Sequence, residues 1–279
     1  SFDDASTKTQ TLGHRGYKGY DNELPYSQGN DGYTKLLLHF DGADASTTFI
    51  DSSAQGKTIV AYGDAQIDTA QSKFGGASGL SDGTGDSLNM SDSDDWNFGS
   101  GDFTIDTWVR FNVMPGGSDI AFFGQGADAN NYYVFGTDGT AGQFKLYFIS
   151  FVAGATNARY VMTNDGGQVV NTWYHIAIVR NGATGLMFID GVSQAVTETT
   201  AFGTLPDIAG PASVFRIVLP GWSADLNGWM DELRVSKGIA RWTSNFDLPS
   251  MAYDNRHLAT NYIASPAKFL SAFNISKYN

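Results

Sequence analysis

The stretch Phe103-Thr-Ile-Asp-Thr-Trp-Val-Arg-Phe111 decides the fold class, because its apolar and polar residues alternate with a period of two. One face of an extended strand here would carry the apolar side chains of Phe103, Ile105, Val109 and Phe111. The opposite face would carry Asp106, Trp108 and Arg110. No long segment of the chain repeats apolar residues every 3.6 positions, so the pattern predicts strands rather than helices.

Short runs of the same kind recur along the chain, separated by clusters of Gly, Asp, Asn and Ser. Two clear examples are residues 143–151 and 173–180. Asp190-Gly191 separates the runs 186–189 and 192–195, which predicts a two-residue hairpin turn. We expect short helical turns only at 91–96 and 236–242. Many short strands with closely spaced turns predict an all-β fold, an antiparallel two-sheet jelly-roll sandwich.

The composition excludes several classes of protein. The 279 residues include no cysteine, which rules out a disulfide scaffold, a thiolate metal site and a cysteine nucleophile. The chain carries 17 Lys and Arg against 29 Asp and Glu, a net charge of −12. Because an acidic surface repels phosphate groups, we expect no nucleic-acid partner. No segment approaches the ~20 apolar residues of a membrane span, so we expect no membrane insertion.

The alternating pattern divides the chain into three parts. Residues 1–34 are rich in Gly and Tyr without alternation and are interpreted as an extended N-terminal arm. Residues 35–249 carry the strand pattern, and residues 250–279 are interpreted as a C-terminal docking tail. Seven tyrosines lie in the two terminal segments, and tyrosine is typical of docking surfaces rather than of free chain. Disorder of both termini is the alternative.

Several motifs within 35–249 occur together and in a fixed order. They are Leu36-Leu-Leu-His-Phe-Asp-Gly42, Thr48-Phe-Ile-Asp-Ser-Ser53, Ser72-Lys-Phe-Gly-Gly-Ala77, Gly101-Asp-Phe-Thr-Ile-Asp-Thr-Trp-Val-Arg110, Thr172-Trp-Tyr-His-Ile-Ala177, Phe188-Ile-Asp-Gly191, Trp229-Met-Asp-Glu-Leu-Arg-Val-Ser236 and Ala240-Arg-Trp242. This order resembles the laminin G-like group of the concanavalin A-like lectin/glucanase superfamily. The first and last motifs are most similar to the copies found in bacteriophage virion and tail proteins.

The resemblance implies a concanavalin A-like jelly roll with a curved face. It implies a non-enzymatic virion structural, decoration or tail-associated protein that exposes the jelly roll for glycan or host-surface contact. The implied partners are a glycan or host-surface polysaccharide, other virion proteins reached through residues 1–34 and 250–279, and further copies of the chain. The alternative is a free-standing, secreted, extracellular carbohydrate-binding adhesion module. A glycoside hydrolase is the less favoured alternative.

The carboxylate pattern argues against hydrolysis. Retaining glycosidases need two carboxyl groups about 5–5.5 Å apart. The only glutamates, Glu23, Glu198 and Glu232, are far apart in sequence, and the Glu-x-Asp-x-(x)-Glu pattern of related glucanases is absent. Strand alternation directs Glu232 and Asp231 to opposite faces. We therefore expect no catalytic residues.

Aromatic residues in loops are the expected sugar contacts. Sugars are held by aromatic surfaces together with polar side chains. Tyr132 and Tyr133, which follow Asn131, are candidates as exposed loop residues. Trp222 is the strongest candidate, because its neighbours Gly221 and Ser223 place it outside a strand. The alternative is that Trp222 caps the edge of the sandwich.

The resemblance also implies one structural calcium ion. The matching positions are Asp41, just after the first core strand, and Asp231 in the last one, with Asp44 as an additional ligand. Ca²⁺ prefers six to eight oxygen ligands, including carboxylates and backbone carbonyls. The alternative is that Asp41 starts a turn and Asp231 pairs with an arginine.

Overall fold

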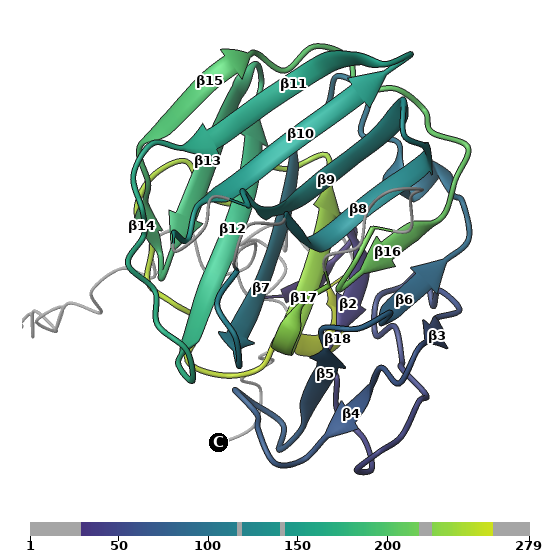
Figure 1. Ribbon diagram of the computed structural model, residues 1–279. Helices are drawn as coiled ribbons and strands as arrows, with labels where there is room; N and C mark the ends of the chain where they lie inside the picture. The colour runs from purple at the N-terminus through teal and green to yellow at the C-terminus, as the bar shows by residue number, and fades with distance from the viewer. Residues whose placement is uncertain (1–28, 116–118, 140–142, 218–224, 259–279) are drawn as a thin grey trace, which may run out of the picture.

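A computed structural model describes residues 29–115, 119–139, 143–217 and 225–258 of the chain. Two antiparallel sheets pack face to face, which confirms the predicted sandwich (Figure 1). The described residues contain no α-helix, only the 3₁₀ helix η1 (Asp94–Trp96), whose N-cap is Ser93. Among those residues, no helix is long and apolar enough to span a membrane.

The sheet nearer the viewer in Figure 1, here the front sheet, has the order β15-β11-β10-β9-β8-β16-β6-β3. Its strands are β3 (Val60–Tyr62), β6 (Ser87–Met90), β8 (Ile120–Asp128), β9 (Asn131–Thr137), β10 (Leu146–Val152), β11 (Ala155–Met162), β15 (Val196–Thr200) and β16 (Ala212–Val214). Strands β8 to β11 follow one another in sequence and in space, and two-residue connections at 129–130 and 153–154 fix the register of β8 with β9 and of β10 with β11.

The back sheet has the order β14-β13-β12-β7-β17-β5-β4, with β2 paired to β17. Its strands are β2 (Thr34–Leu38), β4 (Gln66–Asp68), β5 (Ser78–Asp82), β7 (Phe103–Phe111), β12 (Trp173–Asn181), β13 (Thr184–Ile189), β14 (Val192–Ser193) and β17 (Asn227–Lys237). The terminal strands β1 (Gly29–Asp31) and β18 (Asp254–Leu258) form a separate parallel pair.

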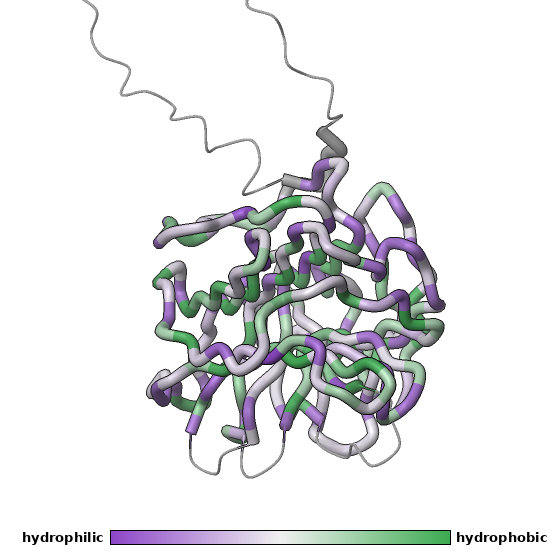
Figure 2. The backbone as a smooth tube through the Cα atoms, turned by 90° about the horizontal axis from the view of Figure 1, so that it is seen from above, coloured by the Kyte–Doolittle hydropathy of each residue, from purple (hydrophilic) through white to green (hydrophobic). Residues whose placement is uncertain are grey.

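The main core fills the space between the sheets. The four apolar residues of β7 predicted to share a face, Phe103, Ile105, Val109 and Phe111, all lie in this core. Asp106 and Trp108 are buried outside it, as alternation requires. Hydrophobic and hydrophilic segments are interspersed along the backbone (Figure 2).

Two local features decide where β13 and β17 turn and bend. Asp190 (φ 49°) and Gly191 (φ 74°) form the predicted hairpin between β13 and β14. In β17, Glu232 has φ 52° and lies at a register shift. The first half of β17 pairs with β5, and the second half of β17 pairs with β2. The expectation that Glu232 and Asp231 face opposite sides is wrong, because this bulge interrupts the alternation. The helical turn expected at 236–242 is also wrong, because β17 continues to Lys237.

Buried ion pairs hold the terminal strands against the outer side of the back sheet. Arg241 on the segment after β17 donates to both carboxylate oxygens of Asp31, at 2.9 and 3.1 Å. The Tyr253 backbone amide donates to Glu232, and the Tyr253 hydroxyl donates to Asp106. Residues 29–31 and 250–258, placed in the predicted arm and tail, therefore have defined contacts in the structure, whereas 1–28 and 259–279 lie outside the described residues.

Candidate functional site

A second apolar cluster lies on the outer side of the front sheet, away from the main core. Its members, here called the front face, are Ala121, Tyr132, Val134, Tyr147, Ile149 and Ile217, with Phe151 and Val161 packed at the margin. Strands β8 to β11 supply all of these except Ile217, which follows β16. The residues between them in sequence, such as Phe135 and Phe148, point into the main core.

Cross-strand register places the front-face residues in rows. One row runs across five strands through the successive partners Arg159, Ile149, Val134, Gly124 and Ser213. Cross-strand partners share a face of the sheet, so Arg159 lies on the same side as the apolar cluster.

Two glycines make room on this face. A Cβ atom at Gly136 would lie 3.0 Å from the Tyr147 ring and 2.0 Å from the Ile120 carbonyl oxygen, and a Cβ at Gly124 would lie 3.2 Å from Ile217. Both glycines therefore allow a large neighbouring side chain to lie flat against the sheet.

The structure separates the two tyrosines that the sequence placed together in a loop. Both belong to β9 and are buried, so the expectation of two exposed loop aromatics is wrong. Tyr133 points into the main core, where its hydroxyl donates to the Trp96 carbonyl, and its ring has no access to a ligand. Tyr132 points to the front face and stacks on Phe151, with ring centroids 5.0 Å apart.

Asn131 is the first residue of β9 and directly precedes Tyr132 of the stacked pair. Its side-chain amide donates to Asp128, and its oxygen accepts from the Ala153 amide at 3.0 Å. These bonds tie the β8–β9 turn to the neighbouring β10–β11 turn. Trp222 lies outside the described residues.

Charged groups border the front face at the opposite end of the strands. Asp119 precedes β8 and Asp138 follows β9, and the pairing of Ile120 with Thr137 brings these two positions side by side. Arg159 on β11 points toward Asp138, with Nη2 and Oδ2 4.0 Å apart. The side chains of Arg159 and Asp138 are 41% and 26% exposed, so both are accessible to a ligand.

The pKa values show that these groups act on one another. Burial raises the pKa of Asp119, and the nearby Asp138 adds to this, although the Gly139 amide donates to Asp119 and opposes it. Burial also raises the pKa of Tyr147 well above its usual range, assisted by Asp119 and Asp138. The buried Tyr147 hydroxyl also acts on the Asp119 carboxylate and opposes the rise of its pKa. The border of the front face thus holds two acceptors, one guanidinium and one hydroxyl.

Sequence reasoning found Tyr132 but missed Tyr147, Phe151, Asp119, Asp138 and Arg159. The alternation within 143–151 was the available signal, because it places Tyr147, Ile149 and Phe151 on one face. No local sequence pattern predicts that Asp119, Asp138 and Arg159 are neighbours, since only strand pairing brings them together.

The predicted calcium ligands occupy different environments. Asp231 is fully buried, and one of its oxygens accepts from the Lys73 and Phe74 amides at 2.7 and 3.0 Å. The other oxygen, Oδ1, has no hydrogen-bond partner. Burial raises the pKa of Asp231 to about 8, the Lys73 and Phe74 amides oppose this, and the nearby Glu232 and Asp41 carboxylates add to it.

Asp41 lies in a different loop, after β2, that packs against the loop of these amides, and its side chain is exposed. Its carboxylate lies against Gly75 (φ 64°). A Cβ atom added to Gly75 would lie 1.9 Å from Asp41 Oδ1, so only glycine leaves room for the carboxylate. Asp44 is also exposed, and its Oδ1 accepts from the amide and hydroxyl of Thr69. Asp41 and Asp231 are therefore the two predicted ligands that face a common loop, residues 73–75.

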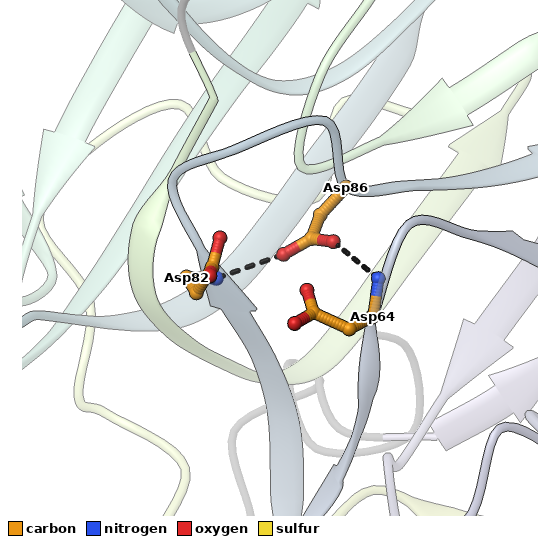
Figure 3. A group of neighbouring side chains, drawn as sticks. All are labelled: Asp64, Asp82 and Asp86. Atoms are coloured by element: carbon orange, nitrogen blue, oxygen red, sulfur yellow. Dashed lines mark hydrogen bonds between the residues drawn. The ribbon is translucent and has the colours of Figure 1, made fainter.

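A different group of carboxylates gathers beside β5. Asp86 is buried and accepts from the Asp64 and Asp82 amides at 2.9 and 2.8 Å (Figure 3). Carboxylate oxygens of Asp64, Asp82 and Asp86 lie within 4.8 Å of one another. Hydrogen bonding and charge from Asp86 raise the pKa of Asp64. The described contacts of Asp86 fasten two turns, which is a structural role.

Solved structures share this fold. Domain 4 of AbnA, a GH43 extracellular arabinanase from Geobacillus stearothermophilus solved with arabinotriose, is 17% identical with a TM-score of 0.54, covering 74% of this chain and 93% of that domain. The binding domain of Paraclostridial Mosquitocidal Protein 1 is 15% identical, with a TM-score of 0.54 and coverage of 75% and 50%. The binding domain of botulinum neurotoxin DC, in complex with SialylT, is 13% identical, with a TM-score of 0.51 and coverage of 75% and 49%.

These likenesses show the fold, and the chain spans about half the length of the two toxin domains. Among curated proteins, no sequence matches this chain. A family profile described as the concanavalin A-like lectin/glucanases superfamily (Laminin_G_3) matches residues 82–241, which is more than half of the chain. The match lies within the segment whose motifs carried the resemblance. The chain belongs to this concanavalin A-like family.

Proposed function

We propose that the chain binds a glycan on the front face, without cleaving it. The observation that carries the proposal is the stacked pair Tyr132–Phe151, in which the Phe151 ring is partly exposed, on the same side of the sheet as the partly exposed Arg159 and Asp138. The apolar faces of sugar rings pack on aromatic rings, while their hydroxyl groups need fixed hydrogen-bond partners. The domain 4 of AbnA that shares this fold was solved with arabinotriose, which supports a sugar as the ligand class.

The proposed setting is a bacteriophage particle, either its surface or its tail. The support is the similarity of the first and last motifs to phage virion copies. In this setting, residues 1–28 and 259–279 reach neighbouring virion proteins or other copies of the chain. Light scattering on the full chain and on a chain lacking residues 1–28 tests this. Equal, monomeric masses with no virion partner captured would contradict it and favour the secreted adhesion module.

A glycan array probed with the full chain tests binding. Phe151→Ala removes the partly exposed ring of the stacked pair, and we expect it to weaken binding about tenfold, equivalent to about 1.4 kcal/mol. Tyr62→Ala is the matched control, because Tyr62 is an exposed aromatic on β3, at the far edge of the same sheet. Equal binding by both variants, or release of reducing sugars from a bound glycan, would contradict the proposal.

We also propose a calcium ion between Asp231 and Asp41. The buried Asp231 Oδ1 without a hydrogen-bond partner supports it, because a buried polar oxygen needs a compensating partner. Hard oxygen donors fit Ca²⁺, and the loop 73–75 that touches both carboxylates offers further backbone carbonyls. The ion would fix this loop against β17.

Thermal unfolding in Ca²⁺ and in excess chelator tests the calcium proposal. We expect a higher Tm in Ca²⁺ for the wild type, through preferential binding to the folded state. Asp231→Asn removes the charge and should abolish this difference. Asp247→Asn, at an exposed position after β17, should keep it. An unchanged wild-type Tm in chelator would contradict the calcium site.

A further inference from the structure

We propose that the outer side of the back sheet carries a second ligand site, which binds glycans that contain a carboxylate group. The site is separate from the front face and lies on the other sheet. Its centre is Arg110 on β7, which pairs with Trp173 of β12 on one side and with Trp229 of β17 on the other. These three residues continue through Leu80 on β5 to Gln66 on β4, and the five are here called the back row.

The back row is accessible from solvent. Its strands lie side by side in the back sheet (Figure 1). Its residues alternate with residues of the main core, such as Val109 beside Arg110 and Met230 beside Trp229, so they face away from the core. All five are partly exposed, whereas the six fully packed members of the front face are 7% exposed or less. A ligand can therefore reach the back row directly.

Arg110 supplies a cation that has no partner oxygen. Its guanidinium carbon lies 4.8 Å from the centre of the Trp229 ring. None of its nitrogens has a hydrogen bond or ion pair with the described residues, and only Nη1 is buried. The other arginines whose side chains the structure describes each have such a partner: Arg159, Arg180, Arg216, Arg234 and Arg241. Nε and Nη2 of Arg110 are therefore accessible donors without an acceptor.

The contact with Trp229 orders this guanidinium for a planar acceptor. A cation is attracted to the face of an indole ring. The indole is itself held in place, because its Nε1 donates to Asp68 at 2.6 Å. A guanidinium matches a carboxylate through two parallel N–H···O bonds, which are stronger than bonds to a neutral hydroxyl. Because its side chain is already ordered, Arg110 loses less conformational freedom on pairing than a free arginine would.

Trp173 supplies an apolar surface on the other side of Arg110. Its ring is partly exposed and has no aromatic or cation contact with the described residues. Sugar rings pack their apolar faces on aromatic rings, while their polar groups need hydrogen-bond partners. Trp173 and Arg110 are direct cross-strand partners, so a sugar ring on Trp173 would bring a carboxylate substituent next to the guanidinium.

The charges around the back row do not make it a positive patch. One further cation, Lys73, lies 3.8 Å from the centre of the ring of Trp108, which is two positions before Arg110 on the same face of β7. The acidic residues on the outer side of the back sheet and on the loops that pack against it are Asp41, Asp68, Asp82, Asp190, Asp231 and Asp247. An acidic ligand is therefore not attracted by the overall charge of this surface.

Three of these acidic residues have partners or carry a proton. Asp68 accepts from the indole N–H described above, and Asp190 accepts from the His175 amide at 2.8 Å. Burial raises the pKa of Asp231 to about 8, so this carboxyl group is largely neutral at pH 7 without a bound cation. Recognition of a carboxylate therefore depends on direct pairing with Arg110.

Matched pairs of oligosaccharides test the inference. The probes are a sialylated and a uronate-containing oligosaccharide, each with a counterpart whose carboxyl group is reduced to an alcohol. Titration calorimetry measures their binding to the full chain. We expect the wild type to bind the acidic member of at least one pair about tenfold more tightly than the reduced member. Arg110→Gln should remove this difference. Trp173→Ala should weaken binding of the acidic member about tenfold, because it removes the apolar surface.

Lys35→Gln is the control, because Lys35 is a partly exposed cation on β2 of the same sheet whose ammonium group donates to the Gly32 carbonyl. It should keep the tenfold difference. No binding of the acidic members by the wild type, or equal binding of both members, would overturn the inference. So would a preference that both Arg110→Gln and Trp173→Ala retain. Binding of uncharged glycans that Phe151→Ala weakens would still support the front face, so the two proposals fail separately.

Discussion

The outer sides of the two sheets are built from the same alternation but serve different purposes. On the back sheet, Asp106, Arg234 and His175 are fully buried under the segments that precede β2 and follow β17. On the front sheet, the border residues Arg159 and Asp138 remain partly exposed. Outward polar residues of a strand therefore fasten the chain where another segment buries them, whereas Arg159 and Asp138 at the border of the front face remain accessible to solvent.

The back side depends on one buried cluster of charges. Arg234 Nε donates to Asp106 at 3.1 Å, and the Tyr253 ring lies 4.0 Å from the Arg234 guanidinium carbon. Tyr253 directly precedes β18, and Arg241 holds Asp31 of β1. These contacts tie both ends of the described chain to β17 and β7.

The largest expected effect is on this cluster. Arg234→Met leaves the Asp106 carboxylate buried without its cation, and we expect a loss of about 3–5 kcal/mol in unfolding free energy. Urea unfolding measures it. A loss below about 1 kcal/mol would show that the cluster is not structural.

Acid should lower the unfolding free energy by protonating Asp106 in the buried cluster on the back sheet. Burial alone would raise the pKa of Asp106, but Arg234, His175 and Tyr253 outweigh it and lower the pKa to about 2. A lowered pKa stabilises the folded state above the unfolded value, and this contribution, about 2 kcal/mol, is lost as pH falls from about 4 toward 2. Unfolding followed between pH 5 and 2 should show this decrease, and Asp106→Asn should flatten it if the variant folds. A wild-type profile without any decrease would contradict the assignment.

Asp231 should give stability the opposite dependence on pH. Its pKa is raised by burial to about 8, so the folded state holds a proton that the unfolded state releases near pH 4. Without a bound cation, stability should therefore fall as pH rises from about 4 to 8. Asp231→Asn should be more stable than wild type at pH 8 in chelator, by on the order of 1–3 kcal/mol. A less stable variant under these conditions would contradict the prediction.

The smallest expected effect on stability is on the front face. Arg159→Gln removes a partly exposed charge, and we expect unfolding free energy to change by about 0.5 kcal/mol or less. Glycan binding should nevertheless weaken if the guanidinium donates to the ligand, as proposed. Wild-type binding by this variant, measured by titration calorimetry, would separate Arg159 from the site.

Sequence alternation predicted the two-sheet fold, the core face of β7 and the hairpin at Asp190-Gly191, because these depend on local periodicity and turn chemistry. It failed where long-range pairing decides. Tyr132 and Tyr133 follow two asparagines and resemble a loop, yet pairing with β8 and β10 makes them a strand with one ring inside and one outside. The bulge at Glu232 and the meeting of Asp119 with Asp138 likewise depend on register, which one sequence does not display.

Hydrogen–deuterium exchange on the full chain, with and without a glycan identified on the array, tests whether the front face binds the glycan. We expect protection confined to β9, β10 and β11, with the segment 238–253 on the back side unchanged. Protection of the back side or of β3 and β6, with β9 to β11 unchanged, would contradict the front face as the binding surface.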